Sequence, residues 1–187
     1  MIAGPSGVGK GSVAGRVLSL DQRGLELSVS VTTRSPRQTE TPGRDYHFVS
    51  EAEFRRMAER GELLEWAEVF GHLSGTPGAW VGERRGQGKD VLLEIDVEGA
   101  RQVKEREPDA VLILLSPPDI EELKRRLRGR ATESDEWIEK RLAKATWELS
   151  QRDLFDHVVV NDELERAAGQ VAAIIASTRS QSEEPSA

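Results

Sequence analysis

The chain has 187 residues, of which 37% are hydrophobic and 32% charged, and this length and composition predict one soluble globular domain. Its formal net charge of −7 disfavours binding of nucleic acid through an overall basic surface. It contains no cysteine and 3 histidines, which excludes disulfides, thiolate zinc sites and cysteine nucleophiles and disfavours a histidine-rich metal centre. No apolar run reaches the roughly 18 residues that a membrane span needs and no signal peptide opens the chain, so we expect a cytoplasmic protein.

Short apolar runs alternate with longer amphipathic patterns along the chain. The apolar runs predict strands at 26–31, 63–69, 91–95, 110–115 and 157–160. The amphipathic patterns predict helices at 11–20, 51–60, 79–85, 98–106, 119–128, 133–150 and 162–178. This alternation predicts an α/β fold, a doubly wound and mainly parallel sheet.

Two regions interrupt the alternation within what we expect to be a single domain. Residues 32–77 begin with a polar, proline-containing segment and are predicted to form an inserted region, and residues 126–150 are rich in arginine and glutamate and are predicted to form a helical lid. The core is then expected from residues 1–31, 78–125 and 151–178, and the polar tail 179–187 is expected to be disordered. Only Met1, Ile2 and Ala3 precede the first glycine-rich loop, so either the first strand is cropped or the true start lies upstream.

This glycine-rich loop lies between a short apolar run and a predicted helix, which is the setting of a phosphate-binding P-loop. Backbone N–H groups of such a loop surround phosphate oxygens, and Lys10 would reach the β- and γ-phosphates of ATP. The strict P-loop pattern fails at one place, because Gly11 stands where Ser or Thr is expected and Ser12 is the nearest hydroxyl. Adenylate kinase and related nucleoside-monophosphate kinases share this variation. The predicted ATP-binding residues are Gly4, Pro5, Ser6, Gly7, Val8, Gly9, Lys10, Gly11 and Ser12.

A second anion site is predicted after the strand 26–31. Arg34 and Arg37 stand three residues apart and Tyr46 follows, and two guanidinium groups with a phenol suit a phosphate. A basic loop alone is more often a solvated surface, so this assignment depends on its context.

Ordered motifs along the chain resemble the guanylate kinase (GMP kinase) family, from Gly4 to about Ile175. The resemblance implies transfer of the γ-phosphoryl group of ATP to GMP, giving ADP and GDP in purine nucleotide metabolism, on a P-loop fold. The motifs are Ser30-x-Thr32-Thr33-Arg34-x-Pro36-Arg37, Tyr46-x-Phe48, Glu65-Trp66-Ala67, Gly75-Thr76-Pro77 and Ile95-Asp96-x-x-Gly99.

The resemblance assigns the acceptor site. It implies that the GMP phosphate is held by Arg34, Arg37 and Tyr46, that the guanine is read by Ser30, Glu65 and Thr76, and that Asp96 belongs to the same site. A carboxylate can accept both the N1–H and the 2-amino group of guanine, which AMP lacks. Two positions depart from the family pattern: Ser74 stands where a tyrosine is usual, which predicts weaker GMP binding, and Thr39 stands where a glycine is usual.

The resemblance also assigns the transfer machinery. With Lys10, it implies catalytic lid arginines at Arg126, Arg130 and Arg141, for which a solvated, salt-bridged helix is the alternative. Asn161 matches an adenine-side position and could equally cap the last helix. We expect Mg²⁺, held mostly through water by Ser12, Glu94 and Asp96.

Three alternatives stay open: a kinase for another nucleotide or a sugar phosphate, a non-catalytic guanylate-kinase-like module that binds phosphopeptides, and an inactive fragment. The expected partners are ATP and GMP, with no nucleic acid and no membrane, and the protein is expected to be a monomer or a homodimer.

Overall fold

The computed structural model describes residues 1–128 and 135–183. The chain divides into two compact units, the first made of Met1–Arg23 with Val111–Ala187 and the second of Gly24–Ala110. The predicted inserted region 32–77 therefore lies in the second unit, together with neighbouring residues on both sides that we assigned to the core.

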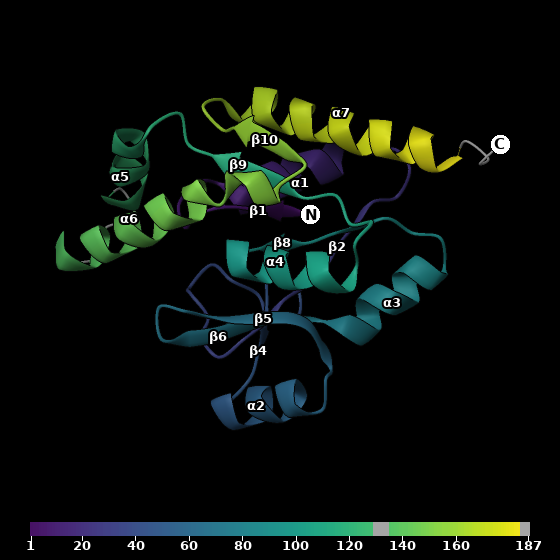
Figure 1. Ribbon diagram of the computed structural model, residues 1–187. Coiled ribbons are helices and arrows are strands. Elements are labelled where there is room, and N and C mark those ends of the chain that lie inside the picture. The colour runs from purple at the N-terminus through teal and green to yellow at the C-terminus, as the bar shows by residue number, and fades with distance from the viewer. Residues whose placement is uncertain (129–134, 184–187) are drawn as a thin grey trace. The chain divides into compact units, whose positions relative to one another are not determined.

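The first unit contains a parallel sheet with the strand order β10-β9-β1 (Figure 1). Its strands are fully apolar on their buried faces, with Ile2, Ala3, Ile113 and Leu114 at most 1% exposed. The helices α1 and α7 pack against each other beside this sheet. The bounds are β1 Ile2–Ala3, α1 Lys10–Leu20, β9 Ile113–Ser116, α5 Ile120–Arg128, α6 Asp135–Ser150, the 3-10 turn η1 Arg152–Leu154, β10 His157–Val160 and α7 Leu164–Glu183.

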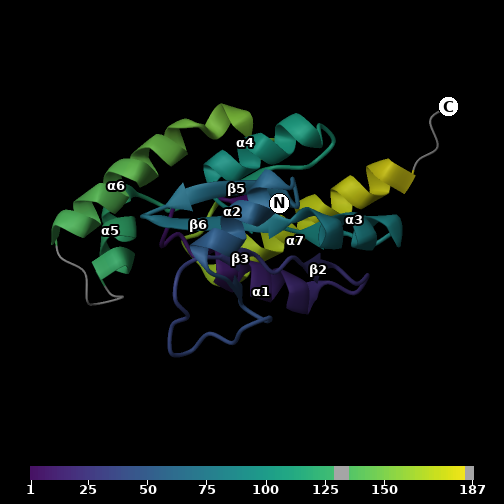
Figure 2. The same cartoon turned by 90° about the horizontal axis from the view of Figure 1, so that it is seen from below.

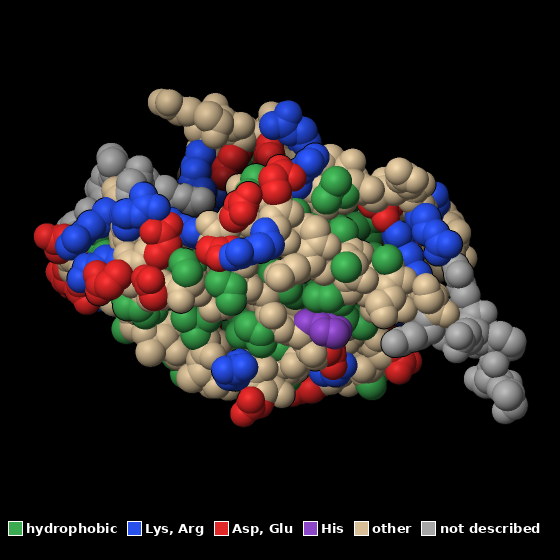
Figure 3. Space-filling model, turned by 90° about the horizontal axis from the view of Figure 1, so that it is seen from above, with side chains coloured by type: hydrophobic (Ala, Val, Ile, Leu, Met, Phe, Trp, Pro, Cys, Tyr) green, Lys and Arg blue, Asp and Glu red, His purple; other side chains and the backbone are tan. Residues whose placement is uncertain are grey.

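The last helix is longer than predicted. It continues to Glu183, beyond the predicted end at residue 178 and into the segment expected to be disordered. One reason is an ion pair near its C-terminal end, where Arg179 contacts Asp21 at the end of α1 and both side chains are nearly buried. Positive and negative side chains are interspersed over much of the surface seen from above (Figure 3). A second ion pair between these two helices joins Arg16 of α1 to Glu165 of α7.

Helix α6, which lies within the predicted lid, packs through apolar side chains on α5, most of which lies in the predicted core. Leu123 and Leu127 of α5 and Ile138, Leu142 and Ala145 of α6 form one buried cluster. The segment between the two helices, residues 129–134, lies outside the described residues.

The second unit contains a sheet with the strand order β4-β3-β6-β5. The β5–β6 hairpin lies between α4 on one side and α2 on the other (Figure 1), and Figure 2 looks onto α2. The apolar centre joins Val31, Phe54, Leu63 and Leu73 from β3, α2, β5 and β6. The bounds are β2 Glu26–Leu27, β3 Val31–Thr32, β4 His47–Phe48, α2 Glu51–Glu59, β5 Leu63–Val69, β6 His72–Pro77, α3 Gly78–Gly86, β7 Val91–Leu92, β8 Glu94–Ile95 and α4 Val97–Arg106.

Several predicted strands differ from the observed ones. The run 26–31 divides into β2 and β3, which pair with different partners, and the run 91–95 divides into β7 and β8. Strand β6 was not predicted, and it forms by antiparallel pairing with β5. The parallel pairs β1–β9, β9–β10 and β2–β7 confirm the predicted α/β class. Within the described part of the chain, no helix is both long and apolar enough to cross a membrane.

Candidate functional site

The glycine-rich loop connects β1 to α1, as predicted, and Gly11 and Ser12 lie in the first turn of that helix. Two positions of the loop require glycine, because the backbone φ angle is positive and because neighbouring atoms leave no room for a Cβ. A Cβ on Gly4, at φ 146°, would lie 2.3 Å from the carbonyl oxygen of Leu115, and a Cβ on Gly9, at φ 97°, would lie 2.6 Å from Nδ2 of Asn161. The loop therefore packs too tightly against its neighbours to carry side chains at these positions.

Lys10 lies over its own loop. Its Nζ donates to the carbonyl oxygens of Gly4 at 2.7 Å and Pro5 at 3.3 Å. A lysine held in this way at a helix N-terminus presents a positive charge beside backbone N–H groups, and both favour a phosphate.

The carbonyl group of Val8 connects the loop to two other predicted site residues. Its oxygen accepts from Nδ2 of Asn161 at 2.8 Å and from Nη1 of Arg126 at 3.3 Å. Arg126 also donates to the carbonyl oxygen of Asn161 at 2.8 Å and to the carboxylate of Glu122 at 2.7 Å. The structure thus brings a predicted adenine-side residue and a predicted lid arginine to the P-loop.

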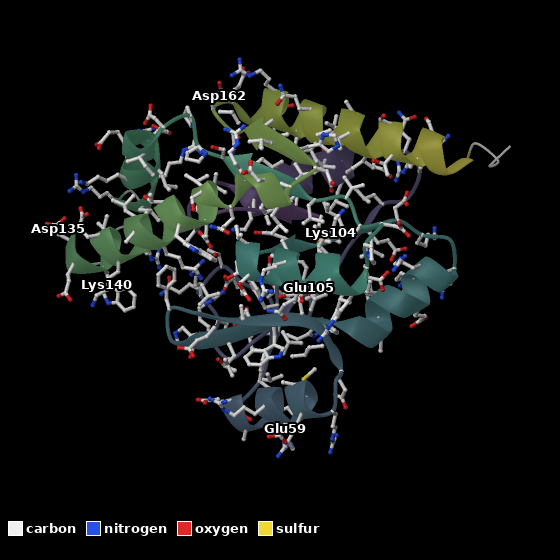
Figure 4. The ribbon with its side chains drawn as sticks, in the orientation of Figure 1. Glu59, Lys104, Glu105, Asp135, Lys140 and Asp162 are labelled. Atoms are coloured by element: carbon white, nitrogen blue, oxygen red, sulfur yellow. The ribbon has the colours of Figure 1, made fainter. Side chains whose placement is uncertain are left out.

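Asn161 and the lid arginines each had an alternative interpretation, as a helix cap and as a salt-bridged surface. The amide of Asn161 contacts the P-loop, and at the start of α7 it is Asp162, labelled in Figure 4, whose carboxylate accepts from the Glu163 N–H. The salt-bridged alternative also describes part of α5, because Glu122 pairs with Arg125 as well as with Arg126. Arg141 lies half-buried on α6, and Arg130 lies outside the described residues.

In the second unit, the predicted phosphate-binding arginine Arg34 pairs with Glu40. Its Nη1 and Nη2 donate to the two carboxylate oxygens at 2.8 and 2.9 Å, and Glu40 also accepts from the backbone N–H of Arg37 at 2.7 Å. The guanidinium carbon of Arg34 lies 5.2 Å from the ring centre of Tyr46. The hydrogen bonds from Arg34 hold the pKa of Glu40 below its ordinary value. Sequence reasoning missed Glu40, although an acidic residue within a basic loop was a usable signal.

Burial has the largest effect on the pKa of Tyr46. It raises the pKa of the phenol, and the negative charge of Glu94 on β8 raises it further. The phenol therefore stays protonated and able to donate a hydrogen bond at neutral pH. Arg34 and Arg37 thus share the Glu40 carboxylate, and Tyr46 lies beside Arg34.

The predicted guanine-reading residues Glu65 and Thr76 form a buried pair across β5 and β6. Their exposed fractions are 4% and 1%, and Oγ1 of Thr76 donates to Oε1 of Glu65 at 2.6 Å. Burial, helped by the negative charge of Asp96, raises the pKa of Glu65 to about 7, although hydrogen bonds from Thr76 and the charge of Arg106 oppose the rise. A buried carboxyl with a pKa this far from its ordinary value is typical of a functional site.

The remaining predicted residues of this unit lie around the same sheet. Ser30 precedes β3 and its carbonyl oxygen accepts from the His47 N–H at 2.9 Å. Asp96 caps α4, with its carboxylate accepting from the Gly99 N–H at 2.8 Å. Ser74 lies on β6 opposite Thr32.

Comparisons with known proteins show the family to which the chain is similar. The family model described as guanylate kinase matches residues 1–178. A guanylate kinase from Rhodococcus jostii is 48% identical over 185 residues, which cover 98% of this chain and 89% of that protein. One from Enterococcus faecalis is 46% identical over 177 residues, which cover 95% of this chain and 87% of that protein.

Solved structures give the same result. The crystal structure of guanylate kinase from Anaplasma phagocytophilum matches with a TM-score of 0.79 and 34% identity, covering 98% of this chain and 85% of that chain, which confirms the predicted P-loop fold. A gluconokinase from Sinorhizobium meliloti matches with a TM-score of 0.51 and 15% identity, which shows a shared fold alone. By sequence and by structure, the chain belongs to the guanylate kinase family.

Proposed function

We propose that this chain transfers the γ-phosphoryl group of ATP to GMP, giving ADP and GDP, through the residues described above. The family match over residues 1–178 supports the reaction. The observation that carries the choice of acceptor is the buried pair of Glu65 and Thr76, because a desolvated carboxylate is costly unless a ligand uses it.

Guanine has the groups that this pair needs. When Glu65 is ionised, its carboxylate accepts the guanine N1–H and the 2-amino group, while Thr76 donates to one carboxylate oxygen. AMP lacks both donors, so its binding would leave the buried carboxylate without a ligand. Sites of this kind reject the wrong ligand by factors of about 10⁴.

The acceptor phosphate is assigned to Arg34, Arg37 and Tyr46. The bidentate contact between Arg34 and Glu40 supports this assignment, because a guanidinium that binds the paired oxygens of a carboxylate can bind phosphate oxygens through the same donor geometry. Tyr46 adds a protonated phenol beside it.

Transfer itself needs positioning and charge neutralisation rather than a general base. The nucleophile is a phosphate oxygen of GMP, which is already anionic at neutral pH. Lys10, Arg126, Arg130 and Arg141 are assigned to stabilise the charge of the transferring phosphoryl group. The contacts of Lys10 and Arg126 with the P-loop support their part of the assignment.

A magnesium ion is proposed to accompany ATP, held mostly through water by Ser12, Glu94 and Asp96. Among the described residues, no three His, Cys, Asp or Glu side chains gather as a metal-binding group. Mg²⁺ bound with ATP keeps several waters and needs few protein ligands, so a hydroxyl at Ser12 and carboxylates at Glu94 and Asp96 would suffice to hold those waters. The charge of the bound ion would stabilise the phosphate oxygens.

The test is ADP release in a coupled assay with Mg-ATP and GMP, AMP, CMP or UMP offered in turn. We expect turnover with GMP and at least about a hundredfold preference over AMP. Equal turnover with several acceptors would contradict the guanine assignment, and GMP binding without turnover would instead favour the non-catalytic module. A cytoplasmic location and a monomeric or homodimeric state stay predictions.

A further inference from the structure

Two side chains of α4 form hydrogen bonds with backbone groups along the outer edge of β5, on both sides of Glu65. The side-chain amide of Gln102 accepts from the Trp66 N–H at 3.2 Å and donates to the Trp66 carbonyl oxygen at 2.8 Å, as a neighbouring strand would. One turn further, Nη1 of Arg106 donates to the carbonyl oxygens of Leu63 at 3.0 Å and Leu64 at 2.6 Å. The other edge of β5 pairs with β6, so the backbone around Glu65 is held from two directions.

Gly99 lies one turn before Gln102 on α4 and is buried. A Cβ at this position would lie 2.4 Å from Oε2 of Glu65 and 3.0 Å from its Cδ. The φ angle of Gly99 is not positive, so the helix does not require glycine here. Glycine is among the least favourable residues in a helix interior, so the missing side chain needs another explanation.

The explanation is the space that the carboxylate occupies. Any side chain at position 99 would force Glu65 to move, because a Cβ contact of 2.4 Å is far below the normal range. The backbone of β5 cannot retreat without breaking the contacts of Gln102 and Arg106. The carboxylate itself must then shift, which disturbs its hydrogen bond from Thr76.

We propose that Gly99 is a specificity-determining position. Because it has no side chain, the Glu65 carboxylate can lie directly against α4, and this position of the carboxylate sets the preference of the enzyme for guanine. This inference rests on the proposed role of Glu65 as the guanine reader. Gly99 acts as a positioning residue, since it works through Glu65. Asp96 supports it by capping the same turn, with its carboxylate on the Gly99 N–H.

The experiment compares Gly99→Ala with a matched control, Gly82→Ala. Gly82 also lies in a helix of the second unit, α3, and a Cβ there would meet nothing within 4 Å. For each variant, kcat and KM are measured with GMP and with IMP, which has the N1–H but lacks the 2-amino group, and KM is measured for ATP. The α4 side chains Lys104 and Glu105, labelled in Figure 4, are left unchanged.

We expect Gly99→Ala to raise the KM for GMP at least tenfold, to change kcat less than threefold, and to reduce the preference for GMP over IMP. Gly82→Ala should change none of these values, and neither variant should change the KM for ATP. Adding Glu65→Asp to Gly99→Ala shortens the displaced side chain and should restore part of the preference.

Three results would overturn the proposal. One is a folded Gly99→Ala variant with the wild-type preference for GMP over IMP. Another is an unfolded Gly99→Ala variant that Glu65→Asp fails to refold. The third is a Glu65→Gln variant that keeps the preference, which would remove the premise, whereas a wild-type protein without any GMP turnover would mark a failure of the proposed function itself.

Discussion

Glu65→Gln should make the protein more stable at alkaline pH while it removes the acceptor for guanine. Burial raises the pKa of Glu65 from 4.5 to about 7. In the folded protein this carboxyl keeps its proton over a pH range in which the unfolded chain has already lost it. One pKa unit corresponds to about 1.4 kcal/mol, so ionising Glu65 in the folded state costs about 3 kcal/mol of stability.

The sign follows from a folded pKa that lies above the unfolded one. The contribution to stability is fully present below pH 4.5, decreases as the pH rises through 7, and is lost above it. Asp96 raises this pKa, while Thr76 and Arg106 lower it, and all three remain in the variant. A glutamine at position 65 does not ionise, so the variant lacks this pH dependence.

The assay is urea unfolding of both proteins at pH 5 and pH 8.5. The free energy of unfolding of Glu65→Gln, relative to the wild type, should increase by about 2–3 kcal/mol between these two pH values. Glu68→Gln, an exposed site on the same strand, is the matched control and should show no such increase. A relative stability of Glu65→Gln that is the same at both pH values would refute the reasoning.

Three further changes test other parts of the structure. Lys10→Ala should lower kcat at least about a hundredfold, because it removes a charge from the P-loop; near-normal kcat would refute the P-loop assignment. Arg34→Ala should raise the KM for GMP by roughly 10–100-fold and leave the KM for ATP unchanged, since it removes charged hydrogen bonds to the acceptor; equal effects on both constants in steady-state kinetics would contradict this separation. Asp21→Ala leaves the nearly buried Arg179 without this carboxylate and should cost about 3 kcal/mol in urea unfolding, and an unchanged midpoint would show that the ion pair contributes nothing.

Local patterns predicted some elements well and others poorly. The strand at 63–69 was predicted with its observed bounds because alternate residues point inward, as the burial of Leu63, Glu65 and Ala67 shows. Strand β6 has no comparable signal, since Gly75 and Pro77 disfavour strands, and its pairing with β5 makes it one. Propensity describes a residue and its neighbours in sequence, whereas β6 depends on a partner strand.

In the candidate site too, some features could be predicted from the sequence and others could not. The ordered motifs assigned Arg34, Glu65 and Thr76 to the candidate site, because a family resemblance carries residue types at fixed positions. It could not show that Glu40 binds Arg34, or that Gly99 leaves room for a carboxylate 34 residues earlier in the chain. Such relations depend on distances between side chains that only the fold determines.

The closure of β5 by α4 also affects how the protein behaves in concentrated solution. An outer strand with unpaired N–H and C=O groups is a template onto which a strand of another molecule can add, which is a common first step of aggregation. At Trp66 both backbone groups are already bonded to Gln102, and at Leu63 and Leu64 the carbonyl oxygens are bonded to Arg106. The same side chains that position the base-reading strand therefore protect its edge from intermolecular β-pairing.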